Sequence, residues 1–254
     1  MRIVLIMILL MTIMPGAYTQ PGQLREAGAM LQKLAAAYQQ PGGLQFSVLF
    51  RYAAEATPNN WLDSLNGRVS LNGQQYWYDI NNTTTVCTRN YIILLFKEDQ
   101  VMYLRKPATG ESATAPGMTG TVMSPMSQTE SFLKNDSTIH CTVNDGRHQR
   151  IITITFTNPS VYKRIEYYIN KRTGLLEKMI NVVRTDQLYD PSVRPALETG
   201  ESYAVVEAVY SGYQPGITDS NVFNSERYFK KEGSAYVTVA PYENYKIFLG
   251  SSNL

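Results

Sequence analysis

The sequence predicts a mainly β protein of the α+β class, in which one helix precedes a series of antiparallel strands. Apolar residues recur at helical spacing mainly near the start of the chain, and runs of alternating apolar and polar residues follow. These runs are short and are separated by turn-forming pairs such as Asn72-Gly73. The 18 Tyr and 8 Phe supply abundant aromatic side chains of the kind that pack on sheet faces.

Residues 1–19 are predicted to be a secretory signal peptide. Arg2 leads into an apolar run that begins at residue 3 and ends before Pro15-Gly16. The run is shorter than the roughly 20 residues of a membrane-spanning helix, so an uncleaved anchor is the less favoured alternative. No cysteine lies directly after the run, which argues against a lipid-anchored lipoprotein. We therefore expect a periplasmic or secreted protein in which residues 20–254 form a single domain.

The first elements of the mature chain are predicted from their periodicity. Apolar residues between Leu24 and Tyr38 recur every three or four positions, which predicts an amphipathic helix that ends at Pro41-Gly42-Gly43. Residues 44–52 alternate between apolar and polar and predict a half-buried strand, and a hairpin through Asn72-Gly73 follows. Further strands are expected at residues 84–89, 91–96, 101–105, 137–143, 151–156, 165–169, 176–182 and 203–213.

Two segments interrupt this series of strands. Residues 107–129 are rich in Ala, Thr, Gly, Ser, Pro and Met and lack a sustained period, which predicts a long loop. The loop is expected to lead into a short helix near residues 127–134. A plain surface excursion is the favoured interpretation of this loop, and an adaptable apolar flap formed by its methionines is the alternative. The stretch from Phe223 to Phe229 is expected to pack across one end of the sheet.

The only cysteines of the chain, Cys87 and Cys141, both lie in strand-like segments. In an oxidising compartment such a pair typically forms a disulfide, and we expect one here. Two buried thiols are the alternative. His140 and His148 are the only histidines, and no pair among these four residues has the spacing of a metal site.

Charge and motifs exclude several classes of function. The 23 basic and 21 acidic residues are nearly balanced and the basic ones are scattered, so the chain lacks the electrostatic pattern of a nucleic-acid-binding protein. Signatures of phosphate-binding loops, zinc proteases and serine hydrolases are also absent from the sequence. We therefore expect a protein that is not an enzyme and that holds no cofactor or metal.

Several segments together resemble a known family. They are the N-terminal helix, the strand at residues 44–52, the segment 67–71 that leads into Tyr76-Trp77-Tyr78-Asp79, and the hairpin over residues 165–182. In this order they are similar to the LolA-like superfamily of periplasmic lipoprotein carriers, and residues 223–229 look like exported relatives of the Bacteroidota type. The resemblance implies a strongly curved antiparallel sheet that forms an unclosed half-barrel. The N-terminal helix and the short second helix would cover its concave face.

The resemblance also implies an apolar cavity, which in the carriers holds lipoprotein acyl chains. Where the carriers have an Arg-Pro-Gly and Phe-Arg-Trp type segment, this chain has residues 56–63. Their functional arginine therefore has no counterpart in that segment, and Arg68 is only a loose candidate. The alternating strands independently predict one apolar sheet face that a hydrophobic ligand can use if helices cover it only in part. The candidate lining residues are Phe46, Val48, Phe50, Val69, Leu71, Tyr76, Tyr78, Ile165, Tyr167 and Ile169.

Two functions follow from this interpretation. In the first, the chain is an exported, non-enzymatic binding protein that carries or senses a hydrophobic ligand, such as a lipid or a lipoprotein acyl chain. In the second, the chain is a structural or docking subunit of an envelope or secreted assembly with a protein partner, and the lining residues form an ordinary core.

Overall fold

One helix and a long series of strands form the described part of the protein, a computed structural model that covers residues 21–107, 139–158, 161–188 and 202–250. The first half contains α1 (Pro21–Tyr38), β1 (Leu44–Ala54), β2 (Asp63–Asn72), β3 (Gln75–Ile80), β4 (Thr83–Cys87), β5 (Ile92–Phe96) and β6 (Val101–Arg105). The second half begins with β7 (Ile139–Asp145), β8 (Gln149–Phe156), β9 (Tyr162–Asn170), β10 (Leu176–Arg184), η1 (Thr185–Gln187) and β11 (Tyr203–Pro215). The chain then continues through η2 (Ser220–Phe223), η3 (Ser225–Arg227), β12 (Phe229–Glu232), β13 (Ala235–Thr238) and β14 (Lys246–Leu249).

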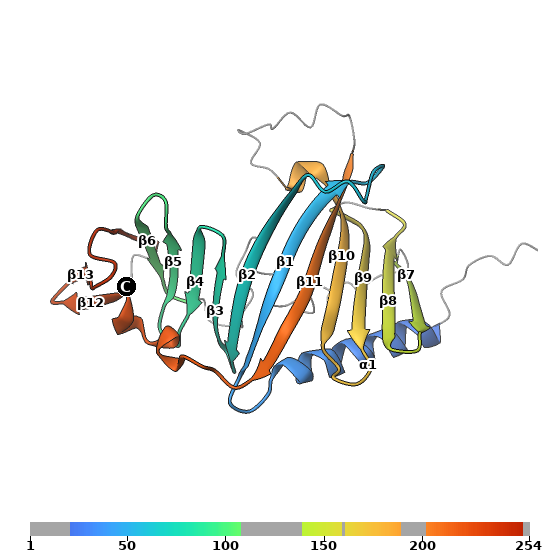
Figure 1. The fold of residues 1–254 in the computed structure, drawn as a ribbon, viewed down its shortest axis with the longest axis horizontal. Helices are drawn as coiled ribbons and strands as arrows, with labels where there is room; N and C mark the ends of the chain where they lie inside the picture. Colours follow the sequence, from blue (N-terminus) through green and yellow to red (C-terminus); the bar gives the residue numbers. More distant parts are fainter. Residues whose placement is uncertain (1–20, 108–138, 159–160, 189–201, 251–254) are drawn as a thin grey trace, which may run out of the picture.

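Twelve of the strands form one large curved sheet (Figure 1). Their order is β14-β6-β5-β4-β3-β2-β1-β11-β10-β9-β8-β7. All neighbours are antiparallel except β14, which lies parallel to β6 at one edge. The two edges do not pair with each other, so the sheet is not closed into a barrel. This arrangement confirms the predicted mainly β, unclosed half-barrel.

The concave face of the sheet carries one continuous apolar cluster. The cluster contains buried residues from β3 to β5, such as Tyr76, and from β7 to β9, such as Tyr167, so the two ends of the sheet contribute to the same core. Cross-strand register explains which side chains share this face. Phe46 pairs with Val69, and Val69 pairs with Tyr78. Side chains in register on neighbouring strands point to the same face.

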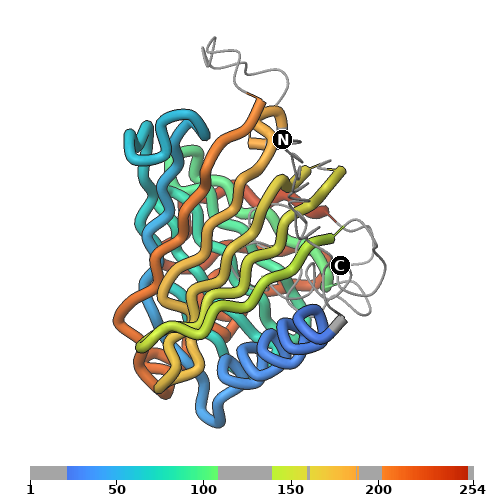
Figure 2. The backbone as a smooth tube through the Cα atoms, turned by 90° about the vertical axis from the view of Figure 1, so that its right-hand side faces the viewer, coloured from blue at the N-terminus to red at the C-terminus, as the bar shows by residue number. Residues whose placement is uncertain are grey.

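Helix α1 covers part of this concave face, as predicted. It runs beneath β10, β9, β8 and β7 in Figure 1 and lies below the same strands in Figure 2. Ala27, Leu31 and Leu34 face the sheet and are at most 1% exposed. Among the helices of the described ranges, none combines the length and the hydropathy needed to cross a membrane.

The outer face of β4, β5 and β6 is covered by the C-terminal segment. Ile93, Leu95 and Met102 are at most 1% exposed and pack with Tyr228 and Phe229. This cover explains why the strand at residues 92–96 is apolar throughout rather than alternating, because both of its faces are buried. The stretch from Phe223 to Phe229 therefore lies on the outside of the sheet, where η2 contacts β3 and β4.

The predicted turns are formed, with one shift of register. Asn72 pairs with Gln75, so Gly73 and Gln74 form the two-residue loop, and Gly73 has a φ of 60°. Glycine at the first loop position is typical of a type II′ hairpin. The predicted signal peptide, the short helix near residues 127–134 and the predicted loop beyond Pro107 lie outside the described residues.

Gly43 closes the turn between α1 and β1, and its substitution tests how closely the chain packs at this turn. Its φ is 90°, and a Cβ atom there would lie 2.5 Å from the Leu71 carbonyl oxygen and 2.7 Å from the Ile217 side chain. Gly42 has a similar φ of 81°, but its Cβ would meet nothing within 4 Å. We expect Gly42→Ala to lower the free energy of unfolding by about 1 kcal/mol and Gly43→Ala by about 3 kcal/mol or more. Urea unfolding of both variants measures the difference, and equal losses would contradict the close contact.

Candidate functional site

The ten candidate lining residues all lie in the concave core or against it. Phe46, Val48, Val69, Tyr76, Tyr78, Ile165, Tyr167 and Ile169 are at most 8% exposed, whereas Phe50 and Leu71 are half-buried. Sequence alternation therefore identified a set of side chains that the fold brings together. Whether they hold a ligand or form an ordinary core depends on their surroundings.

A cluster of aromatic rings lies where the end of α1 meets the centre of the sheet. The Phe46 ring lies 5.1 Å from that of Tyr213, 5.8 Å from Tyr38 and 6.0 Å from Tyr210 between centroids. The Tyr213 hydroxyl donates to the Leu176 carbonyl oxygen at 2.9 Å, so its oxygen accepts from the Tyr38 hydroxyl at 2.6 Å. The result is an apolar surface on which a few hydroxyl groups are held in fixed positions.

Burial controls the protonation of these hydroxyls. It raises the pKa of Tyr38, Tyr210 and Tyr213 above the ordinary value of tyrosine. All three therefore keep their protons at physiological pH. This part of the concave face offers neutral hydroxyl groups rather than charged ones, which suits binding of uncharged molecules.

Sequence reasoning missed Tyr210 and Tyr213 as members of this face, although it placed Tyr38 on the apolar side of the helix that packs against the sheet. Tyr210 and Tyr213 are three residues apart, which places two side chains on opposite faces of a regular strand. The register between β1 and β11 shifts by one residue between Gln45 and Ser47, and Gly212 has a φ of 64°. This bulge returns Tyr213 to the concave face beside Phe46. Glycine inside a strand was the available signal for it.

The concave face opens toward the β14 edge of the sheet. Its residues continue in register from Tyr78 to Thr85, Leu94, Tyr103 and Phe248. Phe248 is 53% exposed and Phe96, in the adjoining row of the same face, is 37% exposed. Leu94 and Tyr103 are half-buried. The apolar face is therefore closed beneath α1 and accessible at this rim.

The predicted disulfide between Cys87 and Cys141 is not formed, and this corrects the sequence expectation. Both residues are buried thiols on the concave face, but Cys87 lies on β4 and Cys141 on the edge strand β7, with seven strands between them in the sheet. Burial raises the pKa of the Cys141 thiol to about 11. A thiol held in the protonated form reacts slowly.

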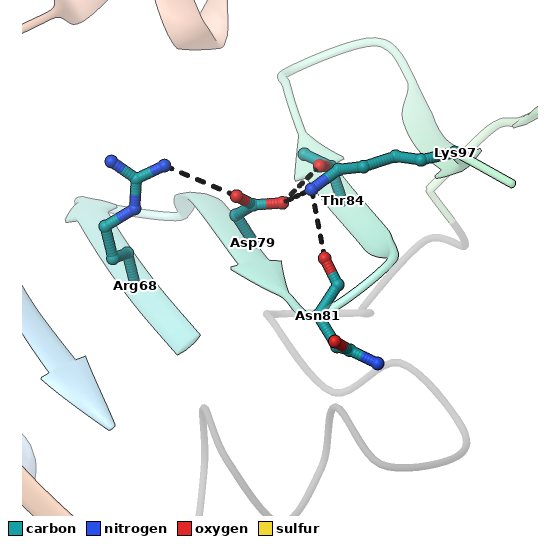
Figure 3. Close-up of polar contacts among 5 residues, drawn as sticks. All are labelled: Arg68, Asp79, Asn81, Thr84 and Lys97. Carbon is teal, nitrogen blue, oxygen red and sulfur yellow. Dashed lines mark hydrogen bonds and ion pairs between the residues drawn. The ribbon is translucent and has the colours of Figure 1, made fainter. Parts of the chain in front are cut away.

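Arg68 lies on the outer face and not on the concave one. It pairs with Asp79, which pairs with Thr84, and this row leads to Leu95 beneath the C-terminal segment. Figure 3 shows the Arg68 guanidinium beside the Asp79 carboxylate. The two groups lie 3.4 Å apart, and the Arg68 side chain is 73% exposed. The candidate counterpart of a carrier arginine is thus remote from the face that carries the lining residues.

Asp79 is the centre of a polar network on that outer face (Figure 3). The Thr84 hydroxyl donates to Asp79 Oδ1 at 2.7 Å, and Lys97 Nζ donates to the same oxygen and to the Asn81 carbonyl at 3.1 Å. Burial raises the pKa of the carboxyl, but the hydrogen bonds from Lys97, Thr84 and Arg68 outweigh it and hold the pKa below the usual value. The network ties β2, β3 and β4 to the turn after β5.

Neither metal binding nor acid–base chemistry stands out in this arrangement. Within the described ranges, no group of three or more His, Cys, Asp or Glu side chains is placed to hold a metal ion. The concave face presents apolar groups and neutral hydroxyls. On the outer face, the Asp79 carboxylate already accepts hydrogen bonds from Thr84, Lys97 and Arg68. The geometry defines a half-barrel protein whose aromatic concave face has exposed side chains at its β14 rim.

Several solved structures are similar to this fold. An uncharacterised conserved protein from Thermus thermophilus is similar at 8% identity and a TM-score of 0.45, over 88% of this chain and 99% of that one. A LolA superfamily protein from Nitrosomonas europaea is similar at 14% identity and a TM-score of 0.34, over 79% and 98% of the two chains. The MucA/MucB complex from Pseudomonas aeruginosa contains a similar chain, at 12% identity and a TM-score of 0.34, over 84% and 63%.

No protein-family model matches the chain, and no curated protein matches its sequence. The assignment as a half-barrel rests on the strand order and register of this chain itself.

The state of the cysteines is a direct test of the concave core. We expect two thiols per chain to react with a chromogenic disulfide reagent in denaturant without any reductant, because both cysteines are thiols in the structure. In the native protein Cys141 should react far more slowly, since burial keeps it protonated. Absence of titratable thiols in denaturant would show that the disulfide forms after all.

The Asp79 network predicts a pH-dependent stability. A carboxyl whose pKa is lowered on folding stabilises the protein above its unfolded pKa of about 4, and this contribution is lost as the pH falls through the folded value. Asp79→Asn should therefore destabilise the protein near neutral pH, and its difference from wild type should shrink in acid. Urea unfolding across pH measures this effect. Asp99→Asn, at an exposed turn position, is the control and should change stability little at any pH.

Proposed function

We propose that this chain is an exported, non-enzymatic binding protein that holds a hydrophobic ligand, such as a lipid or an acyl chain, against the concave face of its half-barrel. Residues 20–254 act as one domain in the periplasm or outside the cell, after removal of residues 1–19. The ten lining residues form the deep part of the binding face, and the β14 rim forms its entrance.

The exposed rings at the rim carry this proposal. Phe96 and Phe248 are large apolar side chains, 37% and 53% exposed, on the same face as the buried Phe46 and Tyr78. If this sheet face served only as a core, exposed aromatic rings would not be expected outside the part that α1 covers. Contiguous exposed apolar surface is typical of binding sites.

The asymmetry of the helical cover supports the same function. Helix α1 contacts β7 at one end of the sheet, while Leu94 and Tyr103 near the other end are half-buried. A ligand seated over these residues would bury apolar surface at roughly 0.8 kcal/mol per methylene group. A chain of modest length therefore suffices for useful affinity.

A docking role is the second candidate, and the edge strand β14 favours it. Leu249 is 52% exposed and pairs with Leu104 on the outer side, so β14 shows apolar side chains on both of its faces. An exposed strand edge can accept a strand from another protein. In this alternative a protein partner, rather than a lipid, covers Phe248 and Leu249.

Binding of the fluorescent apolar probe 1-N-phenylnaphthylamine to the mature protein tests the proposal. We expect the probe to bind the wild type, and Phe96→Asp and Phe248→Asp to weaken its binding about tenfold or more, because each places a charge on the apolar rim. Both side chains are exposed, so the variants should fold. Val237→Asp changes a 42% exposed apolar residue on the β13 hairpin and should leave binding unchanged.

The outcome distinguishes the two candidate functions. Loss of binding at the rim and not at Val237 supports a ligand face. Failure of the wild type to bind the probe, or equal effects of all three substitutions, would contradict it. A protein that co-purifies with the wild type and is lost on Phe248→Asp would then favour docking at β14.

A further inference from the structure

Basic side chains from two hairpins meet at one end of the sheet. They are Arg147 and Arg150 from the β7–β8 hairpin, and Lys171 and Arg172 from the β9–β10 turn. The Lys171 amide donates to the His148 carbonyl oxygen at 3.0 Å, and Lys171 Nζ donates to the Gly146 carbonyl oxygen at 3.2 Å. The fold therefore gathers basic residues that are scattered in the sequence into one surface, which we call the basic turn pair.

Nearby carboxylates neutralise only part of this charge. Asp145 serves two cations, because its Oδ1 lies 2.8 Å from Lys171 Nζ and 3.2 Å from Arg150 Nε. Glu177, at the start of β10, accepts a hydrogen bond from the Asn170 side chain at 2.5 Å. The acidic groups at these hairpins are thus already in use within the protein.

Arg147 and Arg172 carry the charge that is left over. Both side chains are exposed, and within the described ranges neither takes part in an ion pair. A guanidinium group presents a planar set of donors that matches the oxygens of a phosphate or a carboxylate. The two groups are therefore available to an anionic partner.

The opposite end of the same strands differs in its charge. There the basic side chains of β9 and β10 each lie beside a carboxylate. The ion pairs are Lys163–Glu55, Arg164–Glu166 and Arg184–Asp186. The uncompensated positive charge of these strands is therefore concentrated at the end that carries the basic turn pair, which is the lower end of the sheet in Figure 1.

Further basic residues and an exposed apolar residue lie at this end of the sheet. Strands β4 and β6 run in the same direction as β7 and β9, so Arg89, after β4, and Arg105-Lys106, at the end of β6, belong to the same end. Strand β14 is parallel to β6, and its last residue, Leu249, is 52% exposed. Basic and exposed apolar side chains therefore occur together along one end of the half-barrel.

We propose that the basic turn pair docks the protein on an anionic lipid bilayer, with the Arg147 and Arg172 guanidinium groups on lipid phosphates. Positive charge spread over several strand ends fits an extended anionic surface better than a single acidic peptide, which follows one line. Basic residues combined with apolar ones are typical of proteins that bind at the surface of anionic membranes. This inference goes beyond the proposed ligand face, because it concerns how the whole protein is held.

Flotation with lipid vesicles measures this docking. The mature protein is mixed with vesicles of phosphatidylcholine alone, or of phosphatidylcholine and phosphatidylglycerol in equal parts. The test variant carries Arg147→Gln and Arg172→Gln, both at exposed turn positions. The control variant carries Lys230→Gln and Lys246→Gln, which remove the same net charge from exposed positions of β12 and of the opposite end of β14.

We expect the wild type to float with the phosphatidylglycerol vesicles and not with phosphatidylcholine alone. Arg147→Gln with Arg172→Gln should weaken this binding about tenfold or more, because each basic group near an anionic surface adds to the affinity. The control variant should bind like the wild type. Higher salt should release the wild type, since salt screens the attraction between exposed charges.

Two results would overturn the proposal. Equal weakening by the test and control variants would mean that the protein responds only to its net charge. Failure of the wild type to bind phosphatidylglycerol vesicles at low salt would exclude lipid docking, and binding to polyglutamate in the same buffer would instead indicate an acidic protein partner.

A second measurement separates this inference from the proposed ligand face. The test variant should keep the urea midpoint of the wild type and its affinity for 1-N-phenylnaphthylamine, because Arg147 and Arg172 lie on exposed turns outside the concave core. Loss of vesicle binding with probe binding intact supports docking through the basic turn pair. Loss of both together would assign the effect to a general change of the fold and would contradict the proposal.

Discussion

The pairing of β1 with β11 is the contact on which the rest of the structure depends. It joins the meander β2 to β6 to the strands β7 to β10, which otherwise share no edge in the sheet. At this seam Arg51 lies 2.6 Å from Glu207, a residue only 6% exposed, and Lys178 lies 3.7 Å from the same carboxylate. A buried carboxylate needs such partners, so the ion pairs favour this register over a shifted one. The same register brings Phe46 to Tyr210.

The outer face of the sheet is apolar and covered in one half, and charged and uncovered in the other. Strands β4 to β6 are apolar on both sides, because the C-terminal segment covers their outer face. Strands β9 to β11 carry charged side chains such as Glu166 and Lys178 on that side and need no cover. On the concave side α1 covers the β7 end and leaves the β14 end open. Within the described ranges, the proposed ligand face is therefore a consequence of having one α-helix for a very wide sheet.

Local pattern was enough to predict much of this fold, and its failures have physical causes. Alternation over residues 44–52 and the turn at Gly73 are properties of neighbouring residues, and they were predicted correctly apart from a one-residue shift in the loop. The half-barrel itself came from a resemblance rather than from periodicity. The tyrosine cluster was missed because Tyr38 and Tyr213 meet only through the β1–β11 pairing and a bulge. Strand propensity does not place Cys87 and Cys141 relative to each other, and both are free thiols in the structure rather than the expected disulfide.

The short strand β14 affects the risk of aggregation while the chain folds. It is the final described strand, and it pairs with β6, whose Met102 and Leu104 are fully buried on the outer face. Until residues 246–249 arrive, β6 presents an unpaired backbone edge flanked by exposed apolar side chains. Such an edge is a template for aggregation between nascent or truncated chains. The C-terminal segment therefore covers the edge of β6 and leaves the shorter strand β14 as the free edge, and chains that lack the segment would be the first to precipitate.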